Sequence, residues 1–459
     1  MNPHVFRAYD IRGRADRDLG DELVTRLGKA IGTHLVRDGR ANVVVGRDCR
    51  MHSPRLHAAL LCGLCSTGIA VIDIGVSATP MLYFAVHHLD AGGGIQITGS
   101  HNPADDNGFK ILRGKVSIHG DEIQHLRELV ETNDFVEASG PAPEQRDVSQ
   151  AYIDTIAQRI ELGPRRMKVV VDAGNGVGGI GVPVLRNLGF DVTPLHCEPD
   201  GRFPNHHPDP TIERNVVDLR REVARVGAEV GIAFDGDADR LGVVDERGRM
   251  VWGDQLMILF ARAILLEVPG ATFVSEVKCS KALYDEIERA GGKAIMWKVG
   301  HSLIKEKMKA VDAQLAGEMS GHIFFRHRWF GFDDAVYAAA RLLELLSQSE
   351  MTLADHVDTL PLVFNTPEIR YAVAEELKFE IVRLALARFS ETLEVNGLDG
   401  ARITWPDGGG WALVRASNTQ AALVLRFEAP SGERLTELRG FVEHELQQIE
   451  ARLVAGRIT

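Results

Sequence analysis

The sequence predicts an α/β protein of several domains with an α+β unit at its C-terminal end. The chain has 459 residues, more than one hydrophobic core usually supports, and roughly 150 residues per domain gives about three domains, with four also in range. Short β-branched runs alternate with amphipathic stretches through the first three quarters of the chain, which is typical of parallel sheets covered by helices. After Pro367 the order changes to a strand, a helix, several strands and a final helix.

The predicted strands are short apolar runs rich in valine and isoleucine. They cover residues 42–45, 70–74, 94–98, 168–171, 230–234, 272–277 and 294–299, and later 411–414 and 421–427. The predicted helices repeat apolar residues at helical spacing. They cover residues 21–36, 55–65, 121–131, 216–226, 280–290 and 335–346.

Composition predicts three boundaries between domains. Residues 137–147 are rich in Pro, Gly, Ala and Glu, residues 244–251 form a charged turn, and residues 359–367 carry two prolines. These segments divide the chain into domains 1–147, 148–248, 249–362 and 363–459.

The charge and the apolar content exclude several classes of protein. The formal net charge is -12 and no run of Lys and Arg stands out, so a nucleic-acid partner is not expected. Residues 1–13 do not read as a secretory signal, and the longest apolar region, 256–268, is too short to span a bilayer. We expect a cytoplasmic protein without a membrane partner, and a monomer is favoured because nothing marks an oligomer interface.

The five cysteines indicate reduced thiols rather than a disulfide framework. Cys62 and Cys65 form a CxxC pair within the predicted helix 55–65, but no second pair completes a zinc site. We expect both to be buried helix residues.

One segment places a serine directly after a predicted strand. Residues 91–110 read AGGGIQITGSHNPADDNGFK, so Ser100 lies on a tight loop at the carboxyl end of a strand, where α/β proteins bind ligands. A serine hydroxyl needs a base or a metal to act as a nucleophile, and the loop does not match GxSxG, which argues against an acyl-transferring hydrolase. Taken alone, Ser100 is equally compatible with capping its own loop.

Three carboxylates follow the predicted strand 230–234. Asp235, Asp237 and Asp239 are spaced at i, i+2 and i+4 with small residues between them. A loop can fold such a set around one hard cation such as Mg²⁺, whereas without a cation the charges repel. The glycine and the glutamate of an EF-hand are not in register. Because an apolar strand delivers the cluster, a metal site is favoured over a solvated acidic turn.

Two further segments carry polar groups suited to hydroxyls and to an anion. GEMSGH at 317–322 offers Glu318 and Ser320 to vicinal hydroxyls, and His322 can move a proton near neutral pH. RASNT at 415–419 joins one guanidinium to hydroxyls, an amide and backbone N–H groups that can hold an anion. Each motif alone is also compatible with a turn that satisfies its own backbone.

Two other patterns favour structure over chemistry. His206 and His207 are adjacent and lie between prolines, which predicts a rigid loop rather than a metal site. The glycine-rich residues 172–179 do not keep the GxGxxG register, so a tight strand-to-helix turn is favoured.

The four segments TGSHNP with downstream Lys110, DGDADR, GEMSGH and RASNT occur in this order. With them, the chain resembles the α-D-phosphohexomutase superfamily, and specifically its bacterial phosphomannomutase/phosphoglucomutase branch, over essentially its whole length. The resemblance implies three similar α/β domains with mixed, mainly parallel sheets plus a C-terminal α+β domain, arranged around a central cleft. Each domain would lend one loop to the cleft, in the order phosphoserine, metal, sugar and phosphate.

The resemblance also implies roles for individual residues. Asp235, Asp237 and Asp239 would hold Mg²⁺ together with the phosphate on Ser100. The catalytic residues would be Ser100, His101, Lys110, Arg12, Arg240 and His322. The substrate would be bound by Tyr9, Lys278, Gly300, His301, Glu318, Ser320, His322, Arg415, Ser417, Asn418 and Thr419.

The implied activity is the reversible conversion of hexose 1-phosphate and hexose 6-phosphate, of mannose or glucose, through the phosphoserine and a hexose 1,6-bisphosphate. Phosphoglucosamine mutases also resemble the chain, but they typically carry TASHNP-like and RxSGTE-like loops where this sequence has Gly99, Asn418 and Gln420. That enzyme is the first alternative. A phosphosugar-binding protein without turnover and a metal-dependent phosphatase are alternatives of other classes.

Overall fold

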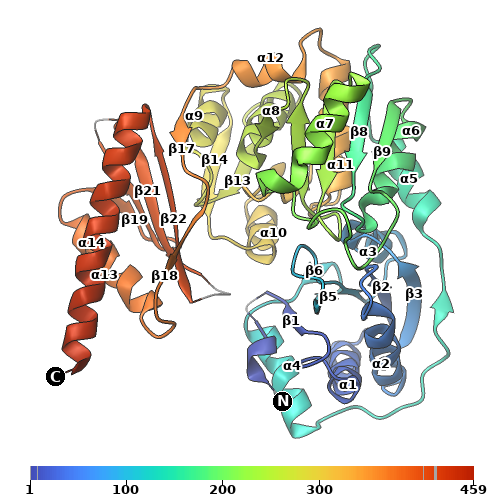
Figure 1. Cartoon of the computed structure of the whole chain (residues 1–459). Coiled ribbons are helices and arrows are strands. Elements are labelled where there is room, and N and C mark those ends of the chain that lie inside the picture. Colours follow the sequence, from blue (N-terminus) through green and yellow to red (C-terminus); the bar gives the residue numbers. More distant parts are fainter. Residues whose placement is uncertain (1, 8, 407, 418–420, 459) are drawn as a thin grey trace.

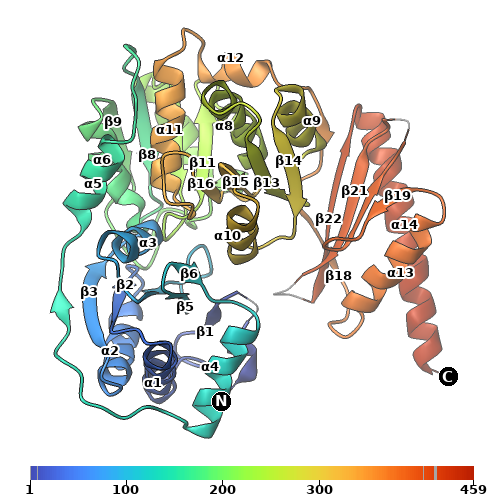
Figure 2. The same ribbon diagram turned by 180° about the vertical axis from the view of Figure 1, so that it is seen from behind.

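The computed structural model describes residues 2–7, 9–406, 408–417 and 421–458. Within this part of the chain, four sheets follow one another along an arc in sequence order, as Figures 1 and 2 show from opposite sides. Each sheet is built from one continuous stretch of chain. None of the described helices is long and apolar enough to cross a bilayer.

Helices cover the sheets and connect their strands. The α-helices are Asp21–Arg37 (α1), Ser53–Cys65 (α2), Thr79–His88 (α3), Asp121–Thr132 (α4), Ser149–Ala157 (α5), Gly181–Asn187 (α6), Val217–Val226 (α7), Gly253–Glu267 (α8), Lys281–Arg289 (α9), His301–Ala310 (α10), Ala335–Ser347 (α11), Leu353–Asp358 (α12), Lys378–Ser390 (α13) and Gly432–Ile458 (α14). Short 3-10 helices are Pro3–Val5 (η1), Val177–Ile180 (η2) and Glu213–Val216 (η3).

The first sheet has a parallel centre and an antiparallel edge. Its strands are Ile11–Arg14 (β1), Asn42–Arg47 (β2), Ala70–Val76 (β3), Gly93–Ile97 (β4), Asp106–Arg113 (β5), Val116–Ser117 (β6) and Glu144–Gln145 (β7). The order is β1-β5-β4-β2-β3-β7, with β6 beside β5. Strands β4, β2, β3 and β7 are parallel, and β5 runs antiparallel to β4 and β1.

The second and third sheets repeat this plan. Their strands are Lys168–Asp172 (β8), Asp191–Leu195 (β9), Val230–Phe234 (β10), Leu241–Asp245 (β11) and Met250–Val251 (β12), then Thr272–Glu276 (β13), Lys293–Trp297 (β14), Leu315–Gly317 (β15) and Ile323–Phe325 (β16). In the order β12-β11-β10-β8-β9, β11 is antiparallel to β10. In the order β14-β13-β15-β16, β16 is antiparallel to β15.

The fourth sheet is antiparallel throughout. Its strands are Phe364–Asn365 (β17), Ile369–Ala372 (β18), Glu394–Asn396 (β19), Ala401–Thr404 (β20), Trp411–Ala416 (β21) and Ala422–Ala429 (β22). Helices α13 and α14 pack against it and enclose a core of its own. This is the predicted α+β unit, and the fold class predicted from the sequence is confirmed.

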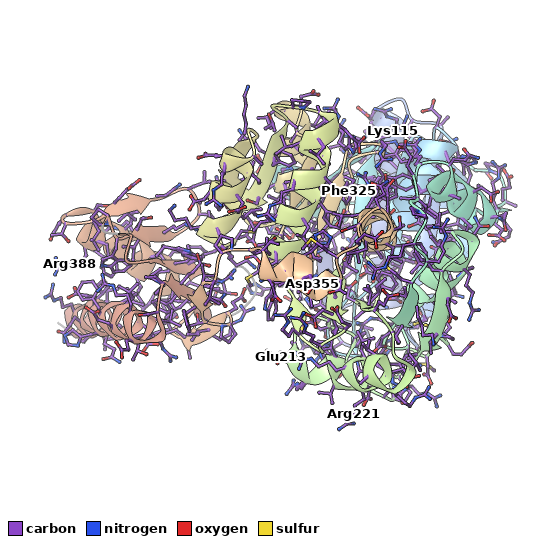
Figure 3. The ribbon with its side chains drawn as sticks, turned by 90° about the horizontal axis from the view of Figure 1, so that it is seen from above. Lys115, Glu213, Arg221, Phe325, Asp355 and Arg388 are labelled. Atoms are coloured by element: carbon purple, nitrogen blue, oxygen red, sulfur yellow. The ribbon has the colours of Figure 1, made fainter. Side chains whose placement is uncertain are left out.

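The second and third sheets share one core, into which α3 of the first unit also packs. Helix α11 is buried at almost every position and contacts α6, α8 and β11, so it ties the two sheets together. Figure 3 shows Phe325 inside the molecule, whereas Arg221 and Arg388 lie at its edge. Sharing a core holds the loops of these two sheets at a constant separation.

The predicted strands and helices all exist, with ends displaced by a few residues. The helix predicted at 216–226 begins as the 3-10 turn η3 and becomes α-helical at Val217. The predicted burial of Cys62 is wrong, because this residue lies on the exposed side of α2 and Cys65 is half-buried. Strand β12 pairs with β11, so the second sheet reaches Val251. The division of the chain into domains at residues 147, 248 and 362 remains a prediction.

Candidate active site

The first three motifs lie on hairpin connections between a buried strand and its antiparallel neighbour, which run from β4 to β5, from β10 to β11 and from β15 to β16. Arg415 of the fourth motif lies near the end of β21, which is antiparallel to β22. In the first three sheets the hairpin is the step where the parallel centre gives way to the antiparallel edge. The repeated topology therefore presents an equivalent loop from each of these sheets. The predicted site residues Asn418 and Thr419 lie outside the described residues.

Ser100 is buried and adopts a left-handed backbone conformation. Its exposure is 3% and its φ angle is 47°, a conformation that costs a non-glycine residue about 1–3 kcal/mol. The hydroxyl donates to Oδ2 of Asp235 at 2.7 Å and lies 3.0 Å from Nδ1 of His101. The strained loop thus aims the serine oxygen at the first carboxylate of the second domain.

The carboxylates of Asp235, Asp237 and Asp239 are fully buried, and their oxygens lie within 4.8 Å of one another. Burial and the two neighbouring charges raise the pKa of Asp235 well above its ordinary value. Oδ1 of Asp237 and Oδ1 of Asp239 are buried without a hydrogen-bond partner among the described residues. Unpaired carboxylate oxygens in this number and spacing fit a hard divalent cation.

Lys110 neutralises part of this charge from the first domain. Its Nζ lies 2.9 Å from Oδ2 of Asp237 and also pairs with Asp239. Burial alone would lower the pKa of Lys110, but the two carboxylates raise it well above its ordinary value, so the ammonium stays charged. Burial likewise would raise the pKa of Asp237, yet Lys110 and the hydrogen bond from Thr79 hold it below its ordinary value.

His322 lies between an arginine and a carboxylate. Nε of Arg240 donates to Nε2 of His322 at 3.0 Å, and Nδ1 of His322 lies 3.2 Å from Oδ2 of Asp333. A guanidinium can only donate, so Nε2 accepts and the ring proton is on Nδ1, facing Asp333. Burial would raise the pKa of Asp333, but the charge of Lys305 and the adjacent ring of His322 hold it well below its ordinary value.

The first and third domains meet at Gly300. The hydroxyl of Tyr9 donates to the carbonyl of Val299 at 3.1 Å, and the amide of Gly300 donates to Oε1 of Glu318 at 2.7 Å. Gly300 has a φ of 129°, and a β-carbon there would lie 2.9 Å from the Tyr9 ring. The next residue, His301, stacks on His322 with ring centres 5.8 Å apart.

The fourth domain joins this network through Asp399. Its Oδ2 accepts from the amide of Val299 at 2.9 Å and lies 3.0 Å from Nε of Arg415. Lys278 of the third domain is 3.2 Å from Oε2 of Glu368 in the fourth. A chain of direct contacts therefore runs from the Ser100 loop through the carboxylates and the 318–322 turn to Arg415.

The remaining predicted residues lie on these loops or, in the case of Arg12, on strand β1 beside them. Nη1 of Arg12 donates to Oδ1 of Asn102 at 3.0 Å, and Arg12 pairs with Asp10 at 2.8 Å. Ser417 is buried at the end of β21, and Ser320 is half-buried in the 318–322 turn. Burial, followed by the charges of Arg240 and Arg12, lowers the pKa of His101 well below its ordinary value, so its ring is neutral.

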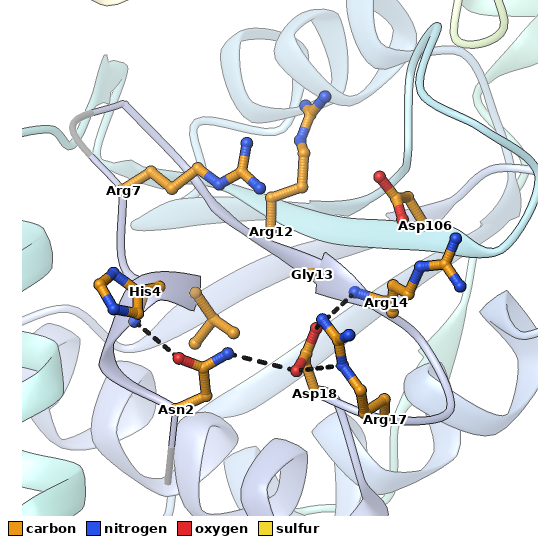
Figure 4. A pocket seen from close by; sticks show the side chains of 10 residues that line it. Asn2, His4, Arg7, Arg12, Gly13, Arg14, Arg17, Asp18 and Asp106 are labelled. Carbon is orange, nitrogen blue, oxygen red and sulfur yellow. Dashed lines mark hydrogen bonds and ion pairs between the residues drawn. The ribbon is translucent and has the colours of Figure 1, made fainter. Parts of the chain in front are cut away.

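A pocket of about 280 Å³ opens beside Arg12, on the first domain. Figure 4 shows Arg7 and Arg12 pointing to one side of β1, while Arg17 and Asp18 lie on the other. Asp18 accepts from Arg17 at 2.8 Å and also from the amide of Arg14. Most of the charge in this pocket is thus paired within the chain.

Sequence reasoning missed several buried polar residues of the site. They are Asp48, Arg50, Thr79 and Asp333. Asp48 and Arg50 follow β2 much as Ser100 follows β4, which is a signal the sequence did contain. Asp333 precedes Asp334, the N-cap of α11, and an acidic pair before a helix predicts capping rather than contact with a distant histidine.

His206 contacts a buried carboxylate that is distant in the sequence. Its Nε2 lies 3.0 Å from Oδ2 of Asp172. Among the described residues, the close groups of metal-ligating atoms are Asp235, Asp237 and Asp239, and Asp239, His322 and Asp333. Neither group contains His206 or His207.

Comparison with known proteins gives the class of this chain. Four domain models described as phosphoglucomutase/phosphomannomutase match it: alpha/beta/alpha domain I over residues 3–137, domain II over 150–248, domain III over 252–363 and the C-terminal domain over 368–445. The chain belongs to the phosphoglucomutase/phosphomannomutase family, within the α-D-phosphohexomutases, and the predicted resemblance is confirmed.

Similar proteins narrow the class to its bacterial branch. A phosphomannomutase/phosphoglucomutase of Pseudomonas aeruginosa is 45% identical over 98% of this chain and 96% of its own length. A phosphoglucomutase of Neisseria gonorrhoeae is 45% identical over 93% of both chains. The crystal structure of a phosphoglucomutase/phosphomannomutase family protein from Burkholderia thailandensis is 39% identical, with a TM-score of 0.90 and 97% of each chain covered.

Proposed function

We propose that this chain interconverts hexose 1-phosphate and hexose 6-phosphate, of mannose or glucose, with Ser100 as the residue that carries the transferred phosphoryl group. The observation that carries the proposal is the 2.7 Å hydrogen bond from the Ser100 hydroxyl to Asp235. It joins the serine of the first domain to the carboxylate cluster of the second. The names of the similar phosphomannomutase/phosphoglucomutase and phosphoglucomutase support the same activity.

The carboxylates of Asp235, Asp237 and Asp239 would hold Mg²⁺ together with the phosphate on Ser100. A bound Mg²⁺ would neutralise charge on the phosphoryl oxygens. Thr79 and Lys110 orient Asp237 through bonds of 2.6 and 2.9 Å. The chain thereby keeps the three carboxylates together at an energetic cost that a cation would relieve.

Phosphoryl transfer depends chiefly on positioning and on neutralising charge. As a sugar hydroxyl bonds to phosphorus and loses its proton, the bond from phosphorus to Oγ of Ser100 would break and Oγ would gain a proton. Lys110 and Arg12 would offset the charge on the transferring group. His101 lies beside the serine, and Arg240 lies beside His322. His322 and Lys110 are the proposed groups for handling the proton.

The remaining predicted residues would bind the sugar phosphate. Glu318 and Ser320 would accept and donate hydrogen bonds to the sugar hydroxyls. Arg415, with Ser417, Asn418 and Thr419, would hold the phosphate that is not transferred. The remaining substrate-binding residues would be Tyr9, Lys278, Gly300 and His301.

The reaction requires a hexose 1,6-bisphosphate intermediate that reverses its orientation within the site. Its other phosphoryl group can then be transferred back to Ser100. The same compound would charge the free enzyme. We extend the proposal to the division into four domains, to a cytoplasmic location, and to a monomer that acts on small phosphosugars without nucleic acid or membrane.

Intact mass spectrometry tests the assignment of Ser100. After incubation with glucose 1,6-bisphosphate, the wild-type chain should gain the mass of one phosphate. Ser100→Ala should gain none, should keep its melting temperature, and should lose activity by on the order of 10³-fold or more. A Ser100→Ala variant that is still phosphorylated, or that keeps most of its activity, would contradict the assignment.

Assays on mannose, glucose and glucosamine phosphates test the sugar preference. The sequence identity to the similar enzymes of Pseudomonas aeruginosa and Neisseria gonorrhoeae favours mannose or glucose over glucosamine. Turnover confined to glucosamine phosphate would contradict this part. Release of inorganic phosphate as fast as isomerisation would instead indicate a phosphatase.

A further inference from the structure

The Ser100 loop is held from its inner side by one arginine that belongs to a different loop. Arg50 is 1% exposed. One terminal nitrogen, Nη2, donates to the carbonyls of Ser100 and Asn102, both at 2.7 Å. The other, Nη1, donates to the carbonyl of Asp106 at 3.0 Å and to that of Pro103. Four carbonyls of one loop thus converge on a single guanidinium.

Asp48 holds the start of the same loop and balances the charge. Its Oδ2 accepts from the amide of Gly99 at 3.0 Å and lies 3.2 Å from Nε of Arg50. Its Oδ1 accepts from the amide of Arg50 at 3.0 Å and from the hydroxyl of Ser53. Asp48 is 2% exposed, so the ion pair is shielded from water. A buried pair with these hydrogen bonds has a defined geometry, because each charge needs all of its partners.

The serine loop is closely packed against both Arg50 and the second domain. A β-carbon at Gly99 would lie 2.3 Å from Nε of Arg50. A β-carbon at Gly236 would lie 2.3 Å from the carbonyl oxygen of Ser100, which also accepts from Arg50. The serine backbone is therefore in contact with both Arg50 and the carboxylate loop of the second domain.

Arg50 also contacts the second domain directly. Its guanidinium carbon lies 5.1 Å from the ring centre of Phe203. A β-carbon at Gly201 would lie 2.4 Å from the carbonyl oxygen of Cys49. Arg50, which binds the carbonyls of the serine loop, thus also packs against the second domain, which supplies the carboxylates.

We propose that Asp48 and Arg50 are positioning residues that hold Ser100 in its left-handed conformation, with Oγ directed at Asp235. A φ of 47° is unfavourable for serine, so the conformation persists only while its surroundings hold it. Arg50 orients the loop through its hydrogen bonds to four backbone carbonyls. Asp48 fixes the start of the loop by accepting from the amide of Gly99. The catalytic part of this inference rests on the proposed role of Ser100.

Arg50→Lys provides the first test, because lysine keeps the charge but lacks the planar fork that reaches several carbonyls. We expect amide hydrogen exchange at residues 99–106 to increase selectively. We expect kcat to fall by about 10²-fold, as for a displaced reacting group. KM should stay within about 3-fold, because the groups proposed to bind the sugar are untouched.

Arg341→Lys is the matched control. Arg341 is also buried, at 4% exposure, donates to the carbonyl of His327 at 3.0 Å, and pairs with Glu344 at 2.7 Å. Its substitution should lower the melting temperature by a similar amount but leave kcat within about 2-fold. A fall in kcat that is equal in the two variants would mean that Arg50 acts only through stability, and would overturn the proposal.

Asp48→Asn carries the test if Arg50→Lys does not fold. Asparagine keeps the size and one acceptor but removes the charge opposite Arg50, and we expect the same exchange pattern with a kcat about 10-fold lower. Unchanged exchange at residues 99–106 in the variant that folds would overturn the proposal, as would failure of both variants to fold. If the wild type lacked mutase activity, the proposed function would fail, while hydrogen exchange would still decide the positioning.

Discussion

Nδ1 of His322 lies 3.2 Å from Oδ2 of Asp333, and the two residues come from different segments of the third domain. Because Arg240 donates to Nε2 of the same ring, the ring proton is on Nδ1, the nitrogen that faces Asp333. The carboxylate is itself anchored by Lys305 at 3.1 Å. His322 is thus held in one tautomer and one orientation.

Asp333→Asn should lower kcat by about 10²-fold, the scale of a misoriented general acid or base, with a smaller effect on KM. Steady-state kinetics with glucose 1-phosphate measure both. Asp245→Asn is the control, since Asp245 is equally buried but pairs with Arg249 at 2.7 Å in a turn of the second domain. A kcat that falls no further in Asp333→Asn than in Asp245→Asn would be inconsistent with the orientation argument.

Arg415→Ala should raise KM by roughly 10- to 100-fold, the loss expected for one or two charge-assisted hydrogen bonds to phosphate. Because the bond is proposed to the phosphate that is not transferred, kcat should change less. Arg388→Ala serves as control, because Arg388 lies on the outer face of the fourth domain and pairs with Glu445 at 2.9 Å (Figure 3). An unchanged KM in Arg415→Ala would exclude the proposed phosphate site.

Removal of divalent metal should abolish turnover, and Mg²⁺ should restore it. Mg²⁺ should also raise the melting temperature, because a ligand bound only by the folded state stabilises it. Asp237→Asn should lose this thermal shift. Asp218→Asn should retain it, since Asp218 is partly exposed and pairs with Arg221. A wild-type chain that shows neither the shift nor sensitivity to chelation would contradict a metal at the carboxylate cluster.

Glu276 should make stability depend on pH. Burial raises the pKa of Glu276 to about 7, although Lys278 lies 3.5 Å away and opposes the shift. A carboxyl group whose folded pKa is raised stabilises the fold fully below its unfolded pKa of about 4.3, and this contribution is lost as the pH rises through 7.

Glu276→Gln removes that dependence, because glutamine stays neutral and can still accept from the amide of Met319. The melting temperature of the variant relative to wild type should therefore rise between pH 4.5 and 8, by up to the equivalent of about 3 kcal/mol. Scanning fluorimetry across this range measures the difference. If the melting temperature of the variant relative to wild type stayed constant or fell with pH, ionisation of Glu276 would not destabilise the folded protein, and the prediction would be wrong.

Local pattern was sufficient to predict many of the longer strands and helices. The apolar runs before Ser100 and before Asp235 are long enough, and bounded sharply enough, to be recognised as buried strands, and β4 and β10 follow them closely. The amphipathic stretches gave the helices for the same reason. Cys62 was assigned wrongly, because an apolar stretch does not indicate which side of a helix faces solvent when most of its residues are apolar.

The antiparallel step after each of the first three motifs was not predicted, although it places these motifs equivalently. The direction in which β5, β11 and β16 return depends on which neighbouring strand offers free backbone groups, and neither strand alone carries that information. Buried polar residues such as Asp48, Arg50 and Asp333 were missed for a related reason, since their partners are distant in sequence.

By itself, the sequence determined the α/β class, the position of four polar loops at the ends of apolar strands, and the residue types available for phosphoryl transfer. Those properties follow from periodicity and side-chain chemistry, which are local. Only the tertiary structure decided that Ser100 faces Asp235, that Arg50 gathers the serine loop, and that Asp333 orients His322. Each of these depends on strands packing from separate stretches of chain, and a bond between distant residues exists only once that packing brings them within about 3 Å.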